Sequence, residues 1–252
     1  PYKFSGFTKI NQVEMDAVYA FVSVTVPEGT PIHPANWVGV DLNTTGHCCV
    51  ASISATGKVL KMGKCAQHVH LKYKNQRRHL QKLGKFRFIK TLKGRESCVI
   101  TDLNHQMSRE AVDFAAKNTA GIVFEDLSGI RNTKKQAKSF RCSLHSWSFY
   151  QLQKFVEYKA KLLGVPVVKI DPAYTSQQCS RCGLLGYRDK KRFKCPACGH
   201  VEDADVNASF VIGLRHQGIL RLPVDRDAGK GSNGTPKKAI ARRKQPFRAH
   251  LS

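Results

Sequence analysis

Two cysteine pairs constrain this chain more than any other feature of its sequence. The segments Cys179-Ser-Arg-Cys182-Gly and Cys195-Pro-Ala-Cys198-Gly are two CxxC units, each followed by glycine. The glycine allows a tight turn whose backbone amides can donate hydrogen bonds to the thiolates. Four thiolates suit tetrahedral Zn²⁺ and leave no open coordination position, so we predict one structural zinc ion. A thioredoxin-type redox pair and an iron–sulfur cluster are the alternative interpretations.

The cysteine count also bears on the cellular compartment. The chain has nine cysteines, and an odd total that includes paired CxxC units is typical of a reducing, intracellular setting. We therefore expect a cytoplasmic protein, nucleoid-associated if the source is prokaryotic. The other cysteines lie within apolar or helical patterns and are expected to be small buried thiols. They are Cys48, Cys49, Cys65, Cys98 and Cys142.

The charge of the chain indicates a polyanionic partner. Forty-two Lys and Arg residues stand against eighteen Asp and Glu residues, which gives a net charge of +24. Such an excess is self-repelling in a compact chain, and binding nucleic acid relieves the repulsion and releases counterions. A membrane surface is the alternative. No stretch is long and apolar enough to span a bilayer, and we recognise no signal peptide.

Basic residues concentrate in one segment and in the C-terminal tail. Residues 72–95 hold ten Lys and Arg residues and no acidic residue. Such a run is usually a solvated helix face, but we predict that this one contacts phosphates without reading bases. Residues 217–252 are basic, lack apolar periodicity, and are expected to be disordered. The candidate nucleic-acid-binding residues are Lys72, Lys74, Arg77, Arg78, Lys82 and Arg181.

The apolar periodicity predicts an α/β chain with a mixed sheet. Three short strands with tight turns predict an antiparallel meander. The predicted strands are 17–26, 37–42, 47–54, 58–62, 121–125 and 167–170, and the predicted helices are 67–83, 96–118, 136–163 and one from 203–205 to about 215.

Three acidic residues occupy positions where a sheet could bring them together. Asp41 and Glu125 each end an apolar strand, and Asp205 opens the last helix. Singly, the first two could be strand terminators and the third a favourable partner of the helix dipole. Jointly, they predict a site for two Mg²⁺ ions, because in-line phosphodiester hydrolysis needs both the attacking and leaving oxygens stabilised.

These segments together resemble the TnpB (OrfB) nucleases, relatives of the type V CRISPR effectors. The similar stretches are Val-Gly-Val-Asp41-Leu, Val-Phe-Glu125-Asp-Leu, Tyr174-Thr-Ser-Gln-Gln-Cys179 with the cysteine pairs that follow, and Asp205-Val-Asn-Ala. They span roughly residues 37–215. The resemblance implies an RNase H-like (RuvC) fold, with Asp41, Glu125 and Asp205 as the catalytic, magnesium-binding residues. It also implies that Cys179, Cys182, Cys195 and Cys198 hold the zinc.

The resemblance implies a division of the chain and its partners. Residues 1–36 would end a wedge-like β region, 37–174 and 201–216 would form the RuvC domain, and 175–200 would form a zinc ribbon that binds the target nucleic acid. Family members bind a guide RNA and cleave the DNA that pairs with it. They usually carry a larger N-terminal region, so here either a missing N-terminal region or a second protein chain would supply those parts. Asn43 stands where a glycine is common.

Three functions remain open from the sequence. The first is a Mg²⁺-dependent, RNA-guided DNA endonuclease. The second is a non-cleaving nucleic-acid-binding relative, such as a guided repressor or accessory protein, for which a lost carboxylate would be the sign. The third is a transposase that joins DNA strands, although no DNA-end-recognition domain is visible. The intact acidic triad favours the first.

Overall fold

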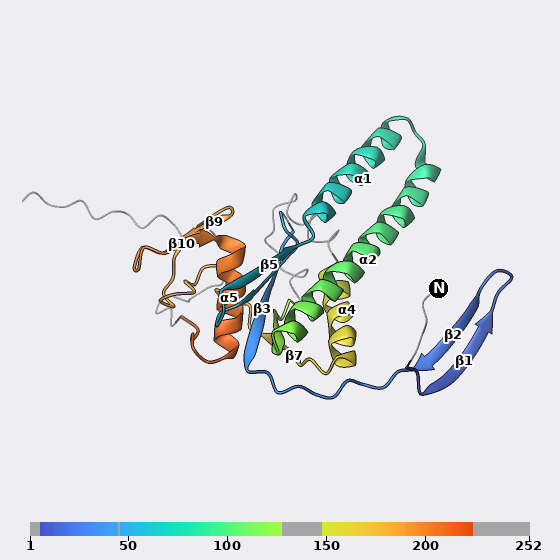
Figure 1. Ribbon diagram of the computed structural model, residues 1–252. Coiled ribbons are helices and arrows are strands. Elements are labelled where there is room, and N and C mark those ends of the chain that lie inside the picture. Colours follow the sequence, from blue (N-terminus) through green and yellow to red (C-terminus); the bar gives the residue numbers. More distant parts are fainter. Residues whose placement is uncertain (1–5, 45, 128–147, 224–252) are drawn as a thin grey trace, which may run out of the picture.

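The computed structural model describes residues 6–44, 46–127 and 148–223 (Figure 1). Its strands are β1 (Lys9–Met15), β2 (Ala20–Thr25), β3 (Asn36–Leu42), β4 (Cys49–Ile53), β5 (Lys58–Met62), β6 (Ala120–Glu125), β7 (Val167–Ile170), β8 (Tyr187–Asp189), β9 (Arg192–Lys194) and β10 (Val201–Asp203). Its helices are α1 (Lys64–Lys82), α2 (Phe86–Lys117), α4 (Phe149–Leu162) and α5 (Ala204–His216).

A five-stranded mixed sheet forms the centre of the fold. Its strand order is β5-β4-β3-β6-β7. The β3–β4 and β4–β5 pairs are antiparallel, whereas β3–β6 and β6–β7 are parallel. Strands β4 and β6 are mostly apolar and are buried on both faces, as expected for strands covered by helices. The predicted meander and the mixed α/β sheet are therefore confirmed.

Helix α5 covers one face of the sheet, and α2 and α4 cover the other (Figure 1). The contact between α5 and β3 is unusually close. A Cβ atom at Gly39 would lie 2.0 Å from the carbonyl oxygen of Ser209 and 2.5 Å from the amide nitrogen of Gly213. Glycine at 39 therefore lets the helix approach the strand that carries Asp41, and this fixes the position of α5 on the sheet.

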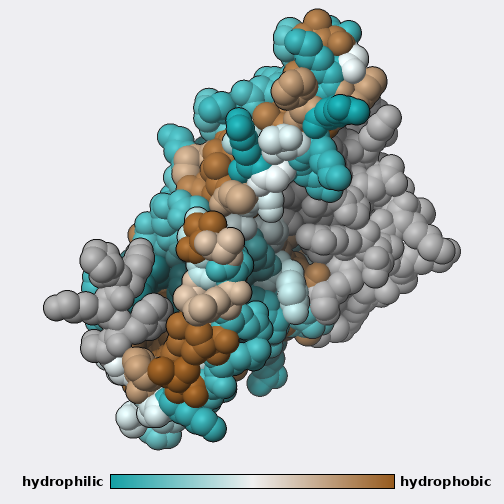
Figure 2. Space-filling model, turned by 90° about the vertical axis from the view of Figure 1, so that its right-hand side faces the viewer, coloured by the Kyte–Doolittle hydropathy of each residue, from teal (hydrophilic) through white to brown (hydrophobic). Residues whose placement is uncertain are grey.

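Helices α1 and α2 form an antiparallel hairpin that projects from the sheet (Figure 1). Helix α2 begins at Phe86, ten residues before the predicted start at 96. The sequence expectation missed this part because residues 86–95 are mostly exposed and so lack a periodic buried stripe. The tip of the hairpin mixes apolar and hydrophilic side chains, as the top of Figure 2 shows.

Strands β1 and β2 form a separate two-stranded antiparallel sheet. Only β2 was predicted. The segment after β2 is attached to α4, because the Gly29 amide donates to the carbonyl oxygen of Lys161 and Glu28 pairs with the Lys161 ammonium at 2.7 Å. The hairpin itself is exposed along its length. The assignment of residues 1–36 to a wedge-like region stays a prediction.

Some sequence expectations need correction, and others fall wholly or partly outside the described residues. Cys48 and Cys49 are buried as predicted, but Cys65 and Cys98 are exposed on the hairpin helices, because the hairpin projects beyond the core. The predicted helix over 136–163 is described only from Phe149 onward. The basic tail from residue 224 and Cys142 lie outside the described residues. In the described part of the chain, no helix is both long and apolar enough to cross a membrane.

Candidate active site and zinc site

Asp41 lies in the middle of the sheet, near the end of β3. Its side chain is 6% exposed. Burial, together with the nearby carboxylates of Glu125 and Asp205, raises the pKa of Asp41 to about 8. The Asn43 amide donates a hydrogen bond of 2.8 Å to Asp41 Oδ2. Asn43, at the position where the family often has glycine, therefore holds the carboxylate in place.

Glu125 ends the neighbouring strand β6, which runs parallel to β3. Carboxyl ends of parallel strands meet at one sheet edge, and this brings Glu125 near Asp41. The Thr175 hydroxyl donates a hydrogen bond to Glu125 Oε1, and the same hydroxyl lies 3.0 Å from the carbonyl oxygen of Pro172. Burial raises the pKa of Glu125.

Asp205 is in the first turn of α5 and is 3% exposed. Asp203 caps this helix, accepting hydrogen bonds from the amides of Asp205 and Val206. Two cations hold the Asp205 carboxylate: Arg188 Nη2 lies 2.8 Å from Oδ1, and Lys191 Nζ pairs with Oδ2. Both cations come from the β8–β9 hairpin of the cysteine-rich insert, so this insert is joined to the acidic site.

The three predicted carboxylates therefore converge from β3, β6 and α5. Each of the other two is close enough to Asp41 to raise its pKa. Three carboxylates brought this close together, with the pKa of Asp41 and of Glu125 raised, are electrostatically costly in a protein unless they bind cations. An oxygen-only donor set of this kind fits a hard divalent cation such as Mg²⁺.

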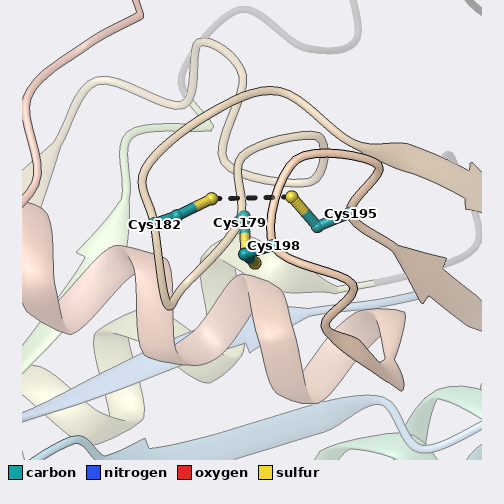
Figure 3. Close-up of side chains that lie close together, drawn as sticks. All are labelled: Cys179, Cys182, Cys195 and Cys198. Atoms are coloured by element: carbon teal, nitrogen blue, oxygen red, sulfur yellow. Dashed lines mark hydrogen bonds between the residues drawn. The ribbon is translucent and has the colours of Figure 1, made fainter.

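The four predicted zinc ligands are also brought together (Figure 3). Their sulfur atoms all lie within 4.8 Å of one another. The Cys179 and Cys198 sulfurs are 3.7 Å apart, and those of Cys182 and Cys195 are 3.5 Å apart. Among the described residues this is the group of soft ligands that fits a tetrahedral ion such as Zn²⁺.

Both cysteine pairs use the same turn. The Gly183 amide donates to the Cys179 carbonyl oxygen and the Gly199 amide to the Cys195 carbonyl oxygen, each at 3.0 Å. Both glycines have positive φ, at 75° and 72°, which explains glycine after each pair. Burial would raise the pKa of the Cys195 thiol, but amides of Cys198 and Ala197 donate to it and bring its pKa to about 7. The second turn thus favours the thiolate at Cys195, whereas burial raises the pKa of the Cys179 thiol and raises that of the Cys182 thiol to about 12.

The candidate nucleic-acid-binding residues do not form one uniform surface. Lys72, Lys74, Arg78 and Lys82 are exposed on α1, and Arg181 is exposed in the first cysteine turn. Arg77 differs, because its guanidinium pairs with Glu96 of α2, whose other oxygen lies 2.9 Å from His70 Nδ1. Arg77 therefore joins the two helices.

Several residues at the acidic site were not predicted. Thr175 contacts Glu125 from 50 residues along the chain, and Arg188 and Lys191 contact Asp205 from 17 and 14 residues before it. Asn207, two residues after Asp205, accepts from the Ser180 amide at 3.0 Å and donates to the Gln178 carbonyl oxygen at 2.7 Å. Asn207 lies in the motif Asp205-Val-Asn-Ala and could have been singled out there.

Comparison with known proteins places the chain in a family. The family model described as "Cas12f1-like, TNB domain" matches residues 149–212. The chain is 31% identical over 218 residues to the TnpB-like protein MJ0751 of Methanocaldococcus jannaschii, covering 80% of this chain and 78% of that protein. It is 42% identical over 115 residues to the CRISPR-associated endodeoxyribonuclease Cas12f1 of Sulfoacidibacillus thermotolerans, covering 44% of this chain and 26% of that protein.

The fold agrees with these sequence relatives. A solved chain of Cas12f1, in a complex with sgRNA and target DNA, superposes with a TM-score of 0.61 at 25% identity, covering 77% of this chain and 52% of that one. The sheet is therefore the RNase H-like (RuvC) sheet of the type V effectors, as the resemblance implied. The chain belongs to the TnpB-like family. It spans only about a quarter of the Cas12f1 sequence and about half of the solved chain.

Proposed function

We propose that this chain is the catalytic part of an RNA-guided DNA endonuclease, and that Asp41, Glu125 and Asp205 are its catalytic residues. The observation that carries the proposal is the convergence of three carboxylates at one sheet edge, which the raised pKa of Asp41 reports. TnpB-like and Cas12f1 relatives, one of them solved with guide RNA and target DNA, support the same activity. Guide RNA and target DNA are accordingly the proposed partners.

The proposed chemistry is hydrolysis of a phosphodiester bond by a two-metal mechanism. Two Mg²⁺ ions at these carboxylates would activate a water and stabilise the leaving oxygen. The chain itself orients the ligands, with Asn43 donating to Asp41 and Thr175 donating to Glu125. Arg188 and Lys191 supply positive charge beside Asp205, where a scissile phosphate is expected to approach.

The four cysteines are proposed to hold one zinc ion with a structural role. The ribbon they form contacts α5 through Asn207 and the acidic site through Arg188. Residues 175–200 are the proposed target-nucleic-acid-binding insert, between the RuvC segments 37–174 and 201–216. The alternatives of a non-cleaving relative and of a strand-joining transposase gain no support from a specific contact.

Guided cleavage can be tested directly. The purified chain is incubated with a guide RNA from its own genomic flank, Mg²⁺, and DNA that either pairs or does not pair with the guide. We expect cleavage of the pairing DNA alone, and none by Glu125→Gln. If wild type binds the RNA but cuts neither DNA, the chain is a non-cleaving relative. If Glu125→Gln cuts like the wild type, the carboxylate assignment is wrong.

The basic face of α1 gives a separate prediction. Replacing exposed Arg78 with Glu is expected to weaken binding to all duplex sequences alike, because phosphate contacts carry no sequence information. It should also reduce the slope of the logarithm of the binding constant against the logarithm of salt concentration by about 1 to 2. Fluorescence polarisation across salt concentrations measures both effects.

Arg77 provides the matched control for Arg78. Because Arg77 pairs with Glu96, replacing it with Gln is expected to lower the thermal stability of the α1–α2 hairpin and leave the salt slope nearly unchanged. An unchanged slope in Arg78→Glu would mean that this face of α1 is merely solvated.

A further inference from the structure

A groove lies along the α1–α2 hairpin and the start of α4, and none of the three acidic-site carboxylates is among its described lining residues. Its volume is about 840 Å³, within the range of sites that bind small ligands. Helix α2 lines it with Phe86, Ile89, Lys90 and Lys93, and α1 contributes Arg77. Residues three or four apart lie on one face of a helix, so a single continuous stripe of α2 faces the groove.

The composition of this stripe is unusual for a surface groove. Phe86 is 68% exposed, although an aromatic ring is stabilised by burial and not by contact with water. Lys90 and Lys93 are exposed beside it, and neither forms an ion pair within the described residues. Among the described residues that line the groove, the one carboxylate is that of Glu96, which is neutralised by Arg77 and contacts His70. The groove therefore presents a flat ring with uncompensated positive charge.

We propose that this groove binds unpaired nucleotides of an RNA strand, with a base stacked on Phe86 and the adjacent phosphates held by Lys90 and Lys93. The chemistry matches each part, because nucleobases stack on aromatic side chains and ammonium groups bind phosphate. The proposal rests on the proposed function, which brings a guide RNA to this protein, and adds to it the site that holds an unpaired part of that RNA.

The polar side chains of the groove favour RNA over DNA. Ser97, Thr101 and Gln151 are among its lining residues. Two of these are hydroxyls that can both donate and accept, as the ribose 2′-hydroxyl does, and Gln151 Nε2 lies 3.2 Å from the Thr101 hydroxyl. A partner that carries 2′-hydroxyls can make contacts here that a deoxyribose strand cannot.

Phe88 offers a matched control for Phe86. It lies on the same helix two residues later and is 63% exposed. Residues two apart project in different directions from a helix, and Phe88 does not line the groove. The two side chains therefore have equal size and similar exposure, but only Phe86 belongs to the site.

Binding without divalent cations tests the proposal independently of cleavage. Fluorescence polarisation with a labelled ten-nucleotide oligouridylate, the matching oligodeoxythymidylate and a blunt DNA duplex is measured for each variant. We expect Phe86→Ala to weaken binding of the RNA strand about 5- to 100-fold and duplex binding less than twofold. Phe86→Trp should restore RNA binding, whereas Phe88→Ala should behave like the wild type.

Several outcomes would overturn the site. The site would be refuted if Phe86→Ala bound the RNA strand as tightly as the wild type, or if the wild type did not bind RNA at all. It would also be refuted if Phe86→Ala and Phe88→Ala lost RNA affinity equally, or if Phe86→Ala lost affinity for the RNA and DNA strands equally. If Phe86→Leu bound the RNA strand as tightly as the wild type, stacking on the ring would be excluded. If light scattering showed a change of oligomeric state in Phe86→Ala, the groove would be occupied by a second copy of this chain. A chain that never cleaves DNA but loses RNA binding in Phe86→Ala would refute the proposed function and leave this site standing.

Discussion

Replacing Asp41 with Asn is expected to abolish Mg²⁺-dependent DNA cleavage and to stabilise the fold at pH 8. A metal ligand stabilises the transition state by several kcal/mol, so its loss should lower the cleavage rate by about 10³-fold or more. The stability effect follows from burial, because Asp41 is 6% exposed and has the other two carboxylates nearby.

The direction of the pH dependence follows from the raised pKa of Asp41. Its pKa is about 8 in the folded state against an ordinary value of 3.8. Between these values the folded state holds the proton more tightly than the unfolded state. The stabilising contribution of protonated Asp41 is therefore complete below pH 3.8 and is lost as the pH rises through 8.

Asn at position 41 carries no charge at any of these pH values and escapes this loss. We expect Asp41→Asn to exceed the wild type in free energy of unfolding by about 1–3 kcal/mol at pH 8, and the difference to vanish near pH 4. Urea unfolding at both pH values, in chelator and in Mg²⁺, measures it. In Mg²⁺ at pH 8 the wild type should recover stability and Asp41→Asn should not.

Asp102→Asn, which removes an exposed carboxylate on α2, is the control for charge alone and should show neither effect. Mg²⁺-dependent cleavage by Asp41→Asn at the wild-type rate would contradict the assignment of the active site. Equal stabilities of Asp41→Asn and the wild type at pH 8 in chelator would contradict the burial of a charged carboxylate.

Replacing Cys195 with Ser is expected to unfold the zinc ribbon and leave the central sheet folded. The ribbon has three strands of three residues each, and its buried cluster holds only Cys179, Phe193, Cys195 and Ala204. So small a core cannot offset the conformational entropy of ordering the ribbon. Structural zinc supplies about 10–16 kcal/mol in comparable small sites, and here it would supply most of the folding free energy.

The loss should be visible at residue level. In hydrogen exchange, we expect protection to disappear over 176–203 and to persist in β3, β4 and β6, and bound zinc should fall from one equivalent to none. Because Arg188 and Lys191 come from this ribbon, Asp205 should lose both cations, and cleavage should fall with the zinc. Chelation of zinc from the wild type should reproduce each change.

Cys65→Ser is the matched control, because Cys65 is exposed on α1 and outside the cysteine group. It should keep one equivalent of zinc and full protection of the ribbon. A Cys195→Ser protein that retains zinc and protection would show that three thiolates and local packing are sufficient. If the wild type showed the absorbance band of an iron–sulfur cluster, the four cysteines would hold that cluster and not zinc.

Some features of this protein could be predicted because they depend on local spacing. The CxxC-Gly spacing predicts two similar turns, and four thiolates at this spacing match a tetrahedral metal site. Strand ends carrying Asp41 and Glu125 meet because parallel strands share an edge. Alternating and continuous apolar runs likewise predicted the five strands of the central sheet.

Other features depend on which distant segments meet, and local pattern carries no information about that. Arg77 looked like its neighbour Arg78 in a basic run, but helix packing pairs Glu96 with Arg77 and leaves Arg78 exposed. The early start of α2 was missed because exposed helix leaves no apolar stripe to read.

The division between sequence and tertiary structure is clearest at the acidic site. The sequence by itself determined which three carboxylates and which four thiolates were candidates, because their types and spacings match metal coordination. Only the tertiary structure decided that Thr175, Arg188 and Lys191 contact two of those carboxylates, and that Phe86 lies in a basic groove. Metal ligands are constrained by coordination geometry, whereas the contacts made by Thr175, Arg188 and Lys191 arise from packing between separate elements of the fold.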